Sequence, residues 1–545
     1  MCRRIVRSLV AMLVLVLWGC HGDRDDGPAV PDRPQQAGSG GVGGTVGSAA
    51  PPGSLQATTG SAGELPHIVP HGALSFELAD VATGKRMPGK VTFVGVKGTP
   101  DPRLSKGDIG DEEGNSLEAF NRVFTLDGTG VVEMPVGTYD VTFSRGIEWT
   151  ISTQRLTLGK AAVELRAKLE HVIDTPHWVS GDFHVHAASS PDSHVPMRDR
   201  VYEFIADGVD MIVSTDHNVV SNYQPVIEEL HAEKLLASAT GDEITTADWG
   251  HFGAFPLPTP RDESEGQGAI AVHNKTASEI FHEVRQASPD AVIDVHHPRL
   301  DRGIGYFYLG KFDDQRDTST RKGFSYDFDA IEILNGYQDT NRRTIDRVMT
   351  DWFALLDRGH IVTATGNSDT HHMTYNLGGY PRNYVLVDND DPGVVKGADV
   401  ARAVKKHHAY FTTGPIVGFT SGGAGIGDVA VAPKGKATIE VTVRAAPWVS
   451  VSRVMLYVAG VVVKKWDVSP SEKVDRFHVA YELALTTDTY AVIRVEGDRP
   501  LAPIVGDLHT VKVTPFALTN PIFFDVDGNG AYDPPLHHGP HDSSP

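Results

Sequence analysis

Two histidines stand at the end of an extended run, Asp182-Phe183-His184-Val185-His186. Successive side chains of a strand alternate between its two faces, so Asp182, His184 and His186 are expected to point the same way. Two imidazoles at this spacing can bind one metal ion. Alone, a His-x-His pair is a weak signal, because two surface histidines can stand at this spacing by chance.

Other candidate ligands stand at the ends of further strand-like runs. They are His217 after residues 209–214, Glu243 after 235–239, His297 after 292–295, and Asp369 and His371 after 361–364; His251 begins the run 251–257. The carboxyl ends of parallel barrel strands gather at one face, where such barrels hold their active sites. Scattered surface histidines would not show this placement, so the ensemble predicts a metal centre.

The ligand types limit the metal and the reaction. The only cysteines are Cys2 and Cys20, so the site must be built from histidines and carboxylates. Such ligands suit zinc, manganese or iron and do not choose among them. Two close ions lower the pKa of a bridging water toward neutrality and polarise a substrate oxygen. Hydrolysis of an ester, carbamate, amide or phosphoester is the natural reaction.

The elements that must position this centre lie between residues 174 and 413. Strand-like runs alternate there with helical patterns at 276–286 and 340–358. This rhythm predicts an α/β fold with a parallel barrel. On either side, residues 67–173 and 414–524 hold short strands separated by turns, which predicts an all-β sandwich before and after the barrel. The strands expected there cover 74–78, 90–96, 137–143, 437–443, 454–463 and 490–495.

The first 66 residues are expected to direct export and not to form part of a folded domain. Residues 1–20 carry Arg3, Arg4 and Arg7 before a short apolar stretch and end at Leu17-Trp18-Gly19-Cys20, which resembles a lipoprotein signal with lipidation at Cys20. The alternative is an ordinary signal peptide cut nearby. Residues 21–66 are rich in glycine, proline and serine and predict a flexible tether. His21 after the cysteine favours the outer membrane of a Gram-negative cell, so the membrane partner would be reached through the lipid anchor only.

The charge of the chain argues against nucleic acid as a partner. Its formal net charge is -21, and removing the basic leader makes it more negative. Binding to phosphate backbones normally uses a lysine- and arginine-rich face. No segment resembles a nucleotide fingerprint or a serine-hydrolase elbow, so no organic cofactor is predicted.

The candidate ligands together resemble the polymerase-and-histidinol-phosphatase (PHP) superfamily of metallohydrolases. The motifs are Asp182-x-His184-x-His186, Asp192, Thr215-Asp216-His217-Asn218, Glu243, His297-Pro298 and Asp369-x-His371. Within it, His297-Pro298-Arg299, Ile331-Glu332-Ile333-Leu334-Asn335-Gly336 and Gly366-Asn367-Ser368-Asp369-Thr370-His371 resemble the CehA/McbA branch, which includes a carbaryl hydrolase.

The resemblance implies a distorted (β/α)7 barrel with two or three divalent ions. The first position would use His184, His186, Glu243 and Asp369; the second Glu243, His251 and His297; the third Asp192, His217 and His371. His194 and His296 compete with the named histidines. Cleavage of an ester, carbamate or amide in a small molecule is the favoured function, with phosphoester cleavage as the alternative. A binding lipoprotein that has lost catalysis is a rival of another class.

Each of the polar residues near the candidate ligands has two possible roles. Asp182 and Asp216 are expected to hold an imidazole by its second nitrogen, although a turn role suits Asp216 nearly as well. Arg299 could stabilise an oxyanion or bind an anionic leaving group, or it could form an ion pair at a loop base. Asn335 and Asn218 could contact substrate, or they could form turns.

The C-terminal segment 525–545 is acidic and contains histidines. Its first residues resemble a calcium loop, with Asp525, Asp527, Asn529 and Asp533 as candidate ligands, against the reading of an acidic surface turn. Leu536 stands where an EF-hand has a bidentate glutamate. His537, His538 and His541 could bind metal non-specifically and carry no catalytic implication.

Overall fold

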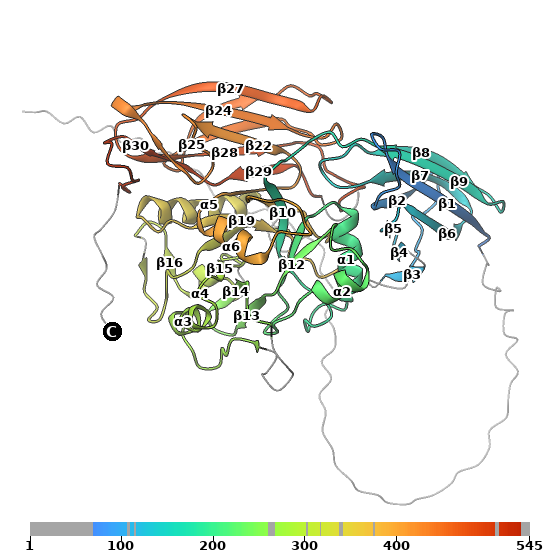
Figure 1. Cartoon of the computed structure of the whole chain (residues 1–545), viewed down its shortest axis with the longest axis horizontal. Coiled ribbons are helices and arrows are strands. Elements are labelled where there is room, and N and C mark those ends of the chain that lie inside the picture. The colour runs from blue at the N-terminus through green and yellow to red at the C-terminus, as the bar shows by residue number, and fades with distance from the viewer. Residues whose placement is uncertain are drawn as a thin grey trace, which may run out of the picture. The chain divides into compact units, whose positions relative to one another are not determined.

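Two β-sheets near the N-terminus pack over one apolar core, drawn in blue in Figure 1. The computed structural model describes residues 69–105, 110–113, 116–259, 268–300, 303–316, 318–336, 342–373, 376–506 and 512–535. The smaller sheet has the order β6-β1-β9 and the larger one β3-β4-β5-β2-β7-β8. The strands are β1 His71–Asp80, β2 Gly89–Val96, β3 Asp111–Glu113, β4 Ser116–Ala119, β5 Arg122–Thr125, β6 Thr129–Pro135, β7 Gly137–Ser144, β8 Ser152–Leu158 and β9 Val163–Leu169.

Sequence alternation explains this packing. In β1, Leu74, Phe76 and Leu78 are buried, and the residues between them are partly exposed. Those three side chains meet Val91 and Phe93 of β2 in one core cluster. The strands expected at 74–78, 90–96 and 137–143 are therefore confirmed. The predicted signal, its Cys20 and the tether at 21–66 lie outside the described residues.

The central region contains two sheets whose strands carry the candidate metal ligands. Along one sheet the order starts β12-β11-β10-β20-β21; the other is β13-β14-β15-β18-β19. The strands are β10 Trp178–Val185, β11 Met211–Ser214, β12 Ala237–Ala239, β13 Asp242–Thr246, β14 Gly250–Phe255, β15 Val292–Val295, β18 Ala330–Asn335, β19 Thr363–Asn367, β20 Arg382–Leu386 and β21 Ala409–Thr412, with the small pair β16 Phe312–Asp313 and β17 Thr318–Ser319. Isolated bridges between Val185 and Thr370 and between His217 and Glu243 link the ends of the two sheets.

The structure agrees with the predicted parallel barrel only in part. Strands β12, β11 and β10 are parallel, as are β15, β18 and β19. However, β13, β14 and β15 pair antiparallel, and β20 is antiparallel to β10. For β13 and β14 the reason is connection length: β13 ends at Thr246 and β14 begins at Gly250, which suits a hairpin and not a helical crossover. The described chain is mostly β-structure with few helices.

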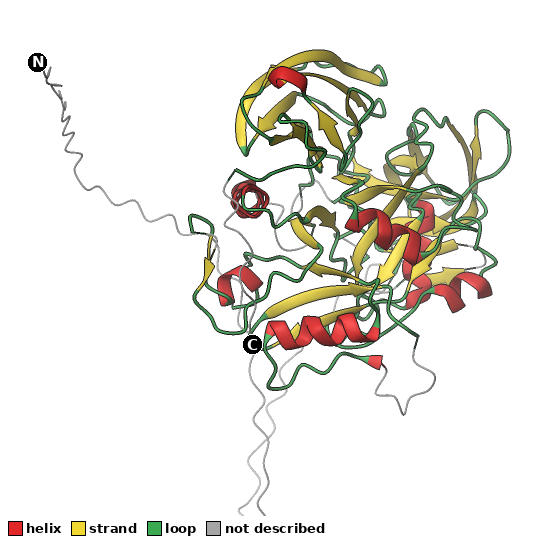
Figure 2. Ribbon diagram, turned by 60° about the vertical axis from the view of Figure 1, so that its left-hand side comes forward, coloured by secondary structure: helices red, strands yellow, loops and turns green. Residues whose placement is uncertain are grey.

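Helices lie outside these strands (Figure 2). The expected helices 276–286 and 340–358 are confirmed as α3 and α5. Thr276 caps α3 in a reciprocal pair of hydrogen bonds with Glu279. The helices are α1 Met197–Ala206, α2 Gln224–Glu229, α3 Ala277–Ala287, α4 Tyr306–Leu309, α5 Arg342–Asp357 and α6 Gly397–Lys405. Within the described parts of the chain, no helix is both long and apolar enough to cross a membrane.

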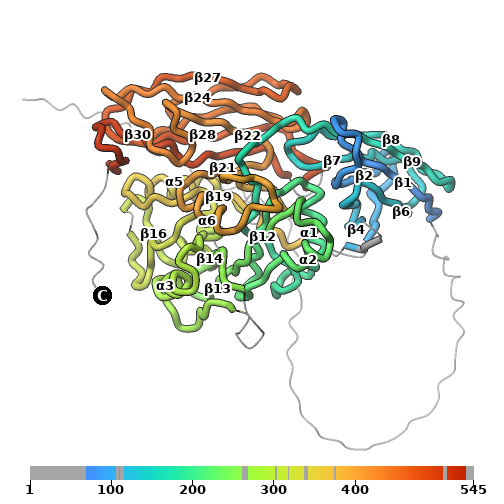
Figure 3. Tube along the Cα trace, viewed as in Figure 1, coloured from blue at the N-terminus to red at the C-terminus, as the bar shows by residue number. Residues whose placement is uncertain are grey.

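The C-terminal strands continue the central sheet. Strand β21 pairs with β29, and the sheet runs on through β28, β25 and β26 without interruption. Figure 3 follows the chain from β21 into this layer. The strands are β22 Ile416–Ser421, β23 Val429–Val431, β24 Lys436–Arg444, β25 Arg453–Val458, β26 Val461–Asp467, β27 Asp475–Ala484, β28 Thr489–Glu496, β29 Phe516–Thr519 and β30 Ile522–Asp525.

Both faces of this C-terminal layer are covered. One face of β28 packs Ile493 and Val495 against the sheet β22-β24-β27, and the other packs Tyr490 and Val492 toward α5. This explains why β28 is almost fully buried. The expected strands at 437–443 and 490–495 are confirmed, and 454–463 is a hairpin of β25 and β26. The expected boundary at 413–414 interrupts no sheet, because β21 and β29 share a ladder.

Candidate metal centre

The predicted metal ligands come together at one edge of the central sheets, most of them at the carboxyl ends of strands and Glu243 and His251 at the amino ends of β13 and β14. His184 lies on β10 and His186 just after it, Glu243 on β13 and His251 on β14. The turns after β11, β15 and β19 supply His217, His297, Asp369 and His371. Most of these side chains are buried, and Asp192 is the most exposed of them. The arrangement follows from the parallel direction of β10, β11, β15 and β19.

Glu243 lies at the centre of the cluster. Its Oε1 is 3.1 Å from His184 Nε2, and its Oε2 is 2.7 Å from His217 Nδ1 and 3.5 Å from His186 Nε2. Three more histidines approach Oε1: His251 Nδ1 at 3.2 Å, His296 Nδ1 at 3.0 Å and His297 Nε2 at 3.5 Å. One carboxylate therefore has imidazoles from the ends of three strands, β10, β11 and β15, and from the β13–β14 hairpin around it.

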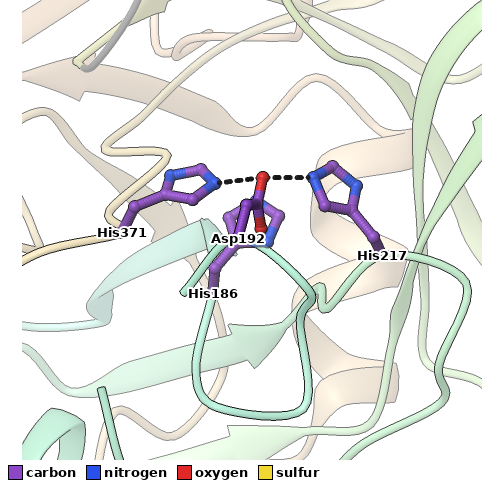
Figure 4. Close-up of side chains that lie close together, drawn as sticks. All are labelled: His186, Asp192, His217 and His371. Atoms are coloured by element: carbon purple, nitrogen blue, oxygen red, sulfur yellow. Dashed lines mark hydrogen bonds and ion pairs between the residues drawn. The ribbon is translucent and has the colours of Figure 1, made fainter. Parts of the chain in front are cut away.

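Two aspartates complete the cluster. Asp369 Oδ1 is 3.2 Å from the Nε2 atoms of both His184 and His186. Asp192 Oδ2 lies between His217 Nε2, at 3.0 Å, and His371 Nε2, at 3.2 Å (Figure 4). The close-up shows His217 and His371 pointing at the same carboxylate oxygen from opposite sides.

Several of these buried atoms have no hydrogen-bond partner although polar atoms surround them. They are His184 Nε2, His186 Nε2, Glu243 Oε2, His251 Nδ1, His296 Nε2 and His297 Nδ1. A buried polar atom without a partner costs about 1–3 kcal/mol. Ligand atoms lie within 4.8 Å of one another in four groups: His186-Asp192-His217-His371, His184-Glu243-His296, His184-His297-Asp369 and His217-Glu243-His251. The donor set fits divalent ions held between these atoms.

In two of the histidines, the contact of the second ring nitrogen determines the tautomer. His184 Nδ1 is 3.1 Å from Glu332 Oε1, and His371 Nδ1 is 2.8 Å from the carbonyl oxygen of Asp369. Both partners accept, so each Nδ1 carries the hydrogen and each Nε2 keeps its lone pair for a metal. Glu332 was not predicted as a site residue. Its signal was a carboxylate within the apolar run 330–334.

The pKa shifts of the histidines in the cluster run in both directions. Burial is the largest cause of the lowered pKa of His186, about 3, and the facing His371 acts in the same direction, so this imidazole is neutral. In His184 and His217 the facing carboxylates outweigh burial and raise the pKa, to about 10 for His217. Burial alone would raise the pKa of Glu243, but the facing rings of His217 and His184 hold it well below its usual range. A neutral imidazole and an ionised carboxylate are the forms that coordinate metals.

Backbone conformation at the site is unusual. His297 has φ 28° and Asp369 has φ 50°, and Asn218 has φ 53°. These are left-handed conformations that residues other than glycine adopt rarely, and they concentrate at functional sites. Asn218 pairs its side chain with the backbone of Thr245, which holds the His217 turn against β13. The turn-forming alternative for Asn218 therefore describes its contacts.

The hydrogen bonds of Asp182 differ from those expected, and those of Asp216 match its turn-forming alternative. Asp182 accepts hydrogen bonds from the backbone N–H groups of Ser368 and Gly379, at 3.1 and 2.8 Å. Burial raises its pKa to about 6. Asp216 accepts from Ala187 N and from the Ser221 hydroxyl. Both carboxylates accept hydrogen bonds from buried backbone N–H groups at the turns that carry the candidate ligands.

Arg299 does not reach the cluster. Its Nε and Nη2 are each 2.7 Å from the carboxylate of Asp351 on α5, and the ring faces of Phe307 and Phe312 lie under the guanidinium. The ion-pair alternative is the one that the structure favours, because both arms of the fork are engaged. Asn335 donates to Glu332 Oε2 and Asp369 Oδ2, so it holds these two carboxylates in place.

The two competing histidines differ. His194 is exposed and belongs to none of the four groups. His296 is fully buried, and its ring stacks on that of His184 at 3.6 Å between centroids. The structure therefore brings His296 into the cluster beside His297.

The expected calcium loop is not assembled as predicted. Both oxygens of Asp525 accept backbone hydrogen bonds, from Gly528 N at 2.6 Å and Gly530 N at 2.8 Å. Asn529 donates to Asp533, so these side chains close a turn. Asp527 and Asp533 instead group with Asp488. The histidines after residue 535 and Leu536 lie outside the described part of the chain.

Comparison with known proteins gives little. No protein-family model matches the chain, and no curated protein matches it. Solved structures with partial likeness include a Bifidobacterium adolescentis protein described as a metal-dependent phosphoesterase, 16% identical over 36% of this chain and 92% of its own, with a TM-score of 0.24. Another is the CARDB domain of a Pyrococcus furiosus protein, 18% identical over 21% of this chain and 96% of its own, with a TM-score of 0.14. TM-scores this low do not establish a shared fold.

Proposed function

We propose that this chain is a metal-dependent hydrolase of the PHP type, in the CehA/McbA branch, with a distorted (β/α)7 barrel between two β-sandwiches. The observation that carries the proposal is the Glu243 carboxylate, which lies within 3.5 Å of six histidines. Six imidazoles around one acid are more than an ion pair uses, and imidazole and carboxylate are the ligand types that hold divalent metals such as zinc, manganese and iron. The motif set in the sequence supports the family.

The family resemblance implies three ion positions in this proposal. The first takes His184, His186, Glu243 and Asp369, the second Glu243, His251 and His297, and the third Asp192, His217 and His371. The groups of close ligand atoms differ from these sets: His217 also lies with Glu243 and His251, and His186 lies with Asp192, His217 and His371, so the His186 ring borders both the first and the third position. Divalent ions such as zinc, manganese or iron would supply a hydroxide from bound water and polarise the substrate oxygen. Glu332 and the carbonyl of Asp369 hold the rings with Nε2 inward, and Asn335 orients Asp369.

The substrate in this proposal is a small molecule with an ester, carbamate or amide bond. The overall negative charge of the chain disfavours a polyanion, and Arg299, the cation that the sequence offered for an anionic group, is held by Asp351. Phosphoester cleavage is therefore the alternative function, and the assays described below distinguish the two. Loss of catalysis in a surface-binding lipoprotein is the third outcome.

The test is metal analysis of the chain without residues 1–20, combined with assays on four p-nitrophenyl or 1-naphthyl substrates: an acetate, a carbamate, a phosphate monoester and a phosphodiester. We expect two or three ions per chain, cleavage of the acetate or carbamate, and loss of at least 100-fold in rate after chelation, with recovery on adding zinc, manganese or iron. Cleavage of phosphoesters alone would move the assignment to a phosphoesterase. Fewer than one ion after reconstitution, and no turnover, would support the binding protein.

Export and anchoring are a separate proposal that rests on residues 1–20. We propose that Cys20 becomes the lipidated first residue of the mature chain at the outer membrane. Cys20→Ser is expected to remove incorporation of labelled palmitate and to release the protein from the membrane fraction of a Gram-negative host. Cys2→Ser is the matched control and should leave labelling unchanged. Equal labelling in the two variants would refute the anchor.

A further inference from the structure

One buried hydroxyl contacts three of the four residues in the outermost ligand group. Ser190 is 3% exposed, and its Oγ lies 3.1 Å from His186 Nδ1. It donates to Asp192 Oδ1 at 2.9 Å and accepts from the backbone N–H of His217 at 3.3 Å. The loop after β10 thus places a hydroxyl in the middle of the group His186-Asp192-His217-His371.

The hydrogen-bonding capacity of Ser190 determines the tautomer of His186. A serine hydroxyl has one donor and two acceptor lone pairs. An ionised carboxylate only accepts, so the single hydrogen goes to Asp192. The remaining lone pairs receive the His217 N–H and His186 Nδ1, which must carry a hydrogen. His186 Nε2 is then a lone-pair donor, 3.2 Å from Asp369 Oδ1.

This group is also the part of the centre nearest solvent. The Asp192 side chain is 48% exposed and that of His217 is 13% exposed. The side chains of His184 and Glu243 are fully buried. An ion held by Asp192 would therefore lie nearest solvent, and we expect it to exchange more readily than one held among the fully buried side chains.

We propose that Ser190 is a positioning residue for the outermost ion, which is the exchangeable ion of the centre. The proposal rests on the metal-dependent function proposed above. Ser190 acts through His186 and Asp192: it fixes which nitrogen of the ring faces the ion and holds the exposed carboxylate in place. Partners of this kind change metal affinity or activity by about 10–100-fold when they are removed.

The test compares Ser190→Ala with Ser180→Ala in the full mature chain. Ser180 is an equally buried serine at the other end of β10, and its hydroxyl donates to Asp210 at 2.8 Å. Bound zinc and manganese are measured against buffered free metal, together with turnover of the substrate that wild type cleaves. For Ser190→Ala we expect one ion to bind about 10–100-fold more weakly, with the remaining ions retained. Excess metal should restore turnover, and Ser180→Ala should bind like wild type.

Three results would overturn the assignment. Wild-type affinity for every ion in Ser190→Ala would show that the hydroxyl does not position the group. A loss of turnover that excess metal does not restore would indicate a structural defect instead. Equal weakening of all ions would contradict an effect confined to the outermost position. Failure of the proposed function appears differently, because wild type itself would then bind no ion.

Discussion

Glu243→Gln is expected to abolish hydrolysis and to release at least one ion from the centre. Both carboxylate oxygens lie against imidazoles, at 3.1 Å from His184 and 2.7 Å from His217. An amide keeps the size of the side chain but removes the negative charge and one acceptor, so the ions it bridges lose a shared ligand. Loss of about 4 kcal/mol of transition-state stabilisation corresponds to a rate about 10³-fold lower.

Metal content and turnover should be measured together in this variant. The matched control is Glu440→Gln, the same change at an exposed position of β24, which should leave metal content and rate unchanged. A folded Glu243→Gln protein with full metal content and a rate within threefold of wild type would exclude Glu243 as the bridging ligand. Circular dichroism and the unfolding midpoint confirm that the variant is folded.

Arg299→Met is expected to destabilise the fold while leaving the chemistry of folded molecules intact. The substitution removes the bidentate partner of the Asp351 carboxylate, which is fully buried. Removing one partner of a buried ion pair costs about 3–5 kcal/mol, because the remaining charge is left without compensation. Arg347 lies 3.4 Å from Asp351 and offsets part of the loss, so about 3 kcal/mol is expected. Denaturant unfolding of the metal-loaded protein measures it.

The control for this prediction is an exposed pair of the same geometry. Arg155 forms two hydrogen bonds of 2.7 Å with Asp140, and its side chain is 53% exposed. Arg155→Met should therefore cost less than about 1 kcal/mol. The double variant Arg299→Met with Asp351→Leu should regain most of the lost stability, since no buried charge remains. A 100-fold drop in turnover with unchanged stability would instead place Arg299 in catalysis.

Local pattern was sufficient for many elements. The alternation at 74–78 predicts β1, because a strand with one face on a core buries every second side chain. The Thr-x-x-Glu capping box predicts the helix that begins near Thr276. Candidate ligands such as His184, Asp369 and His371 were identifiable because histidines and carboxylates after apolar runs are rare outside functional sites.

Local pattern failed where a partner is distant in sequence. Arg299 and Asp351 are joined only because α5 packs back on the loop after β15, and no spacing rule indicates such a pair. The same holds for Asp182, whose partners Ser368 and Gly379 come from turns almost two hundred residues away. Sheet continuity was missed for this reason too, since the ladder between β21 and β29 joins residues about a hundred positions apart.

Residue identity and short-range periodicity were enough to predict the candidate ligand types and the strands that carry them. The folded structure was needed to show that Glu243 is central, that Glu332 and Ser190 contact the second nitrogens of His184 and His186, and that His296 joins the cluster. These contacts join strand ends from separate parts of the chain, and their geometry is set by how the two central sheets meet.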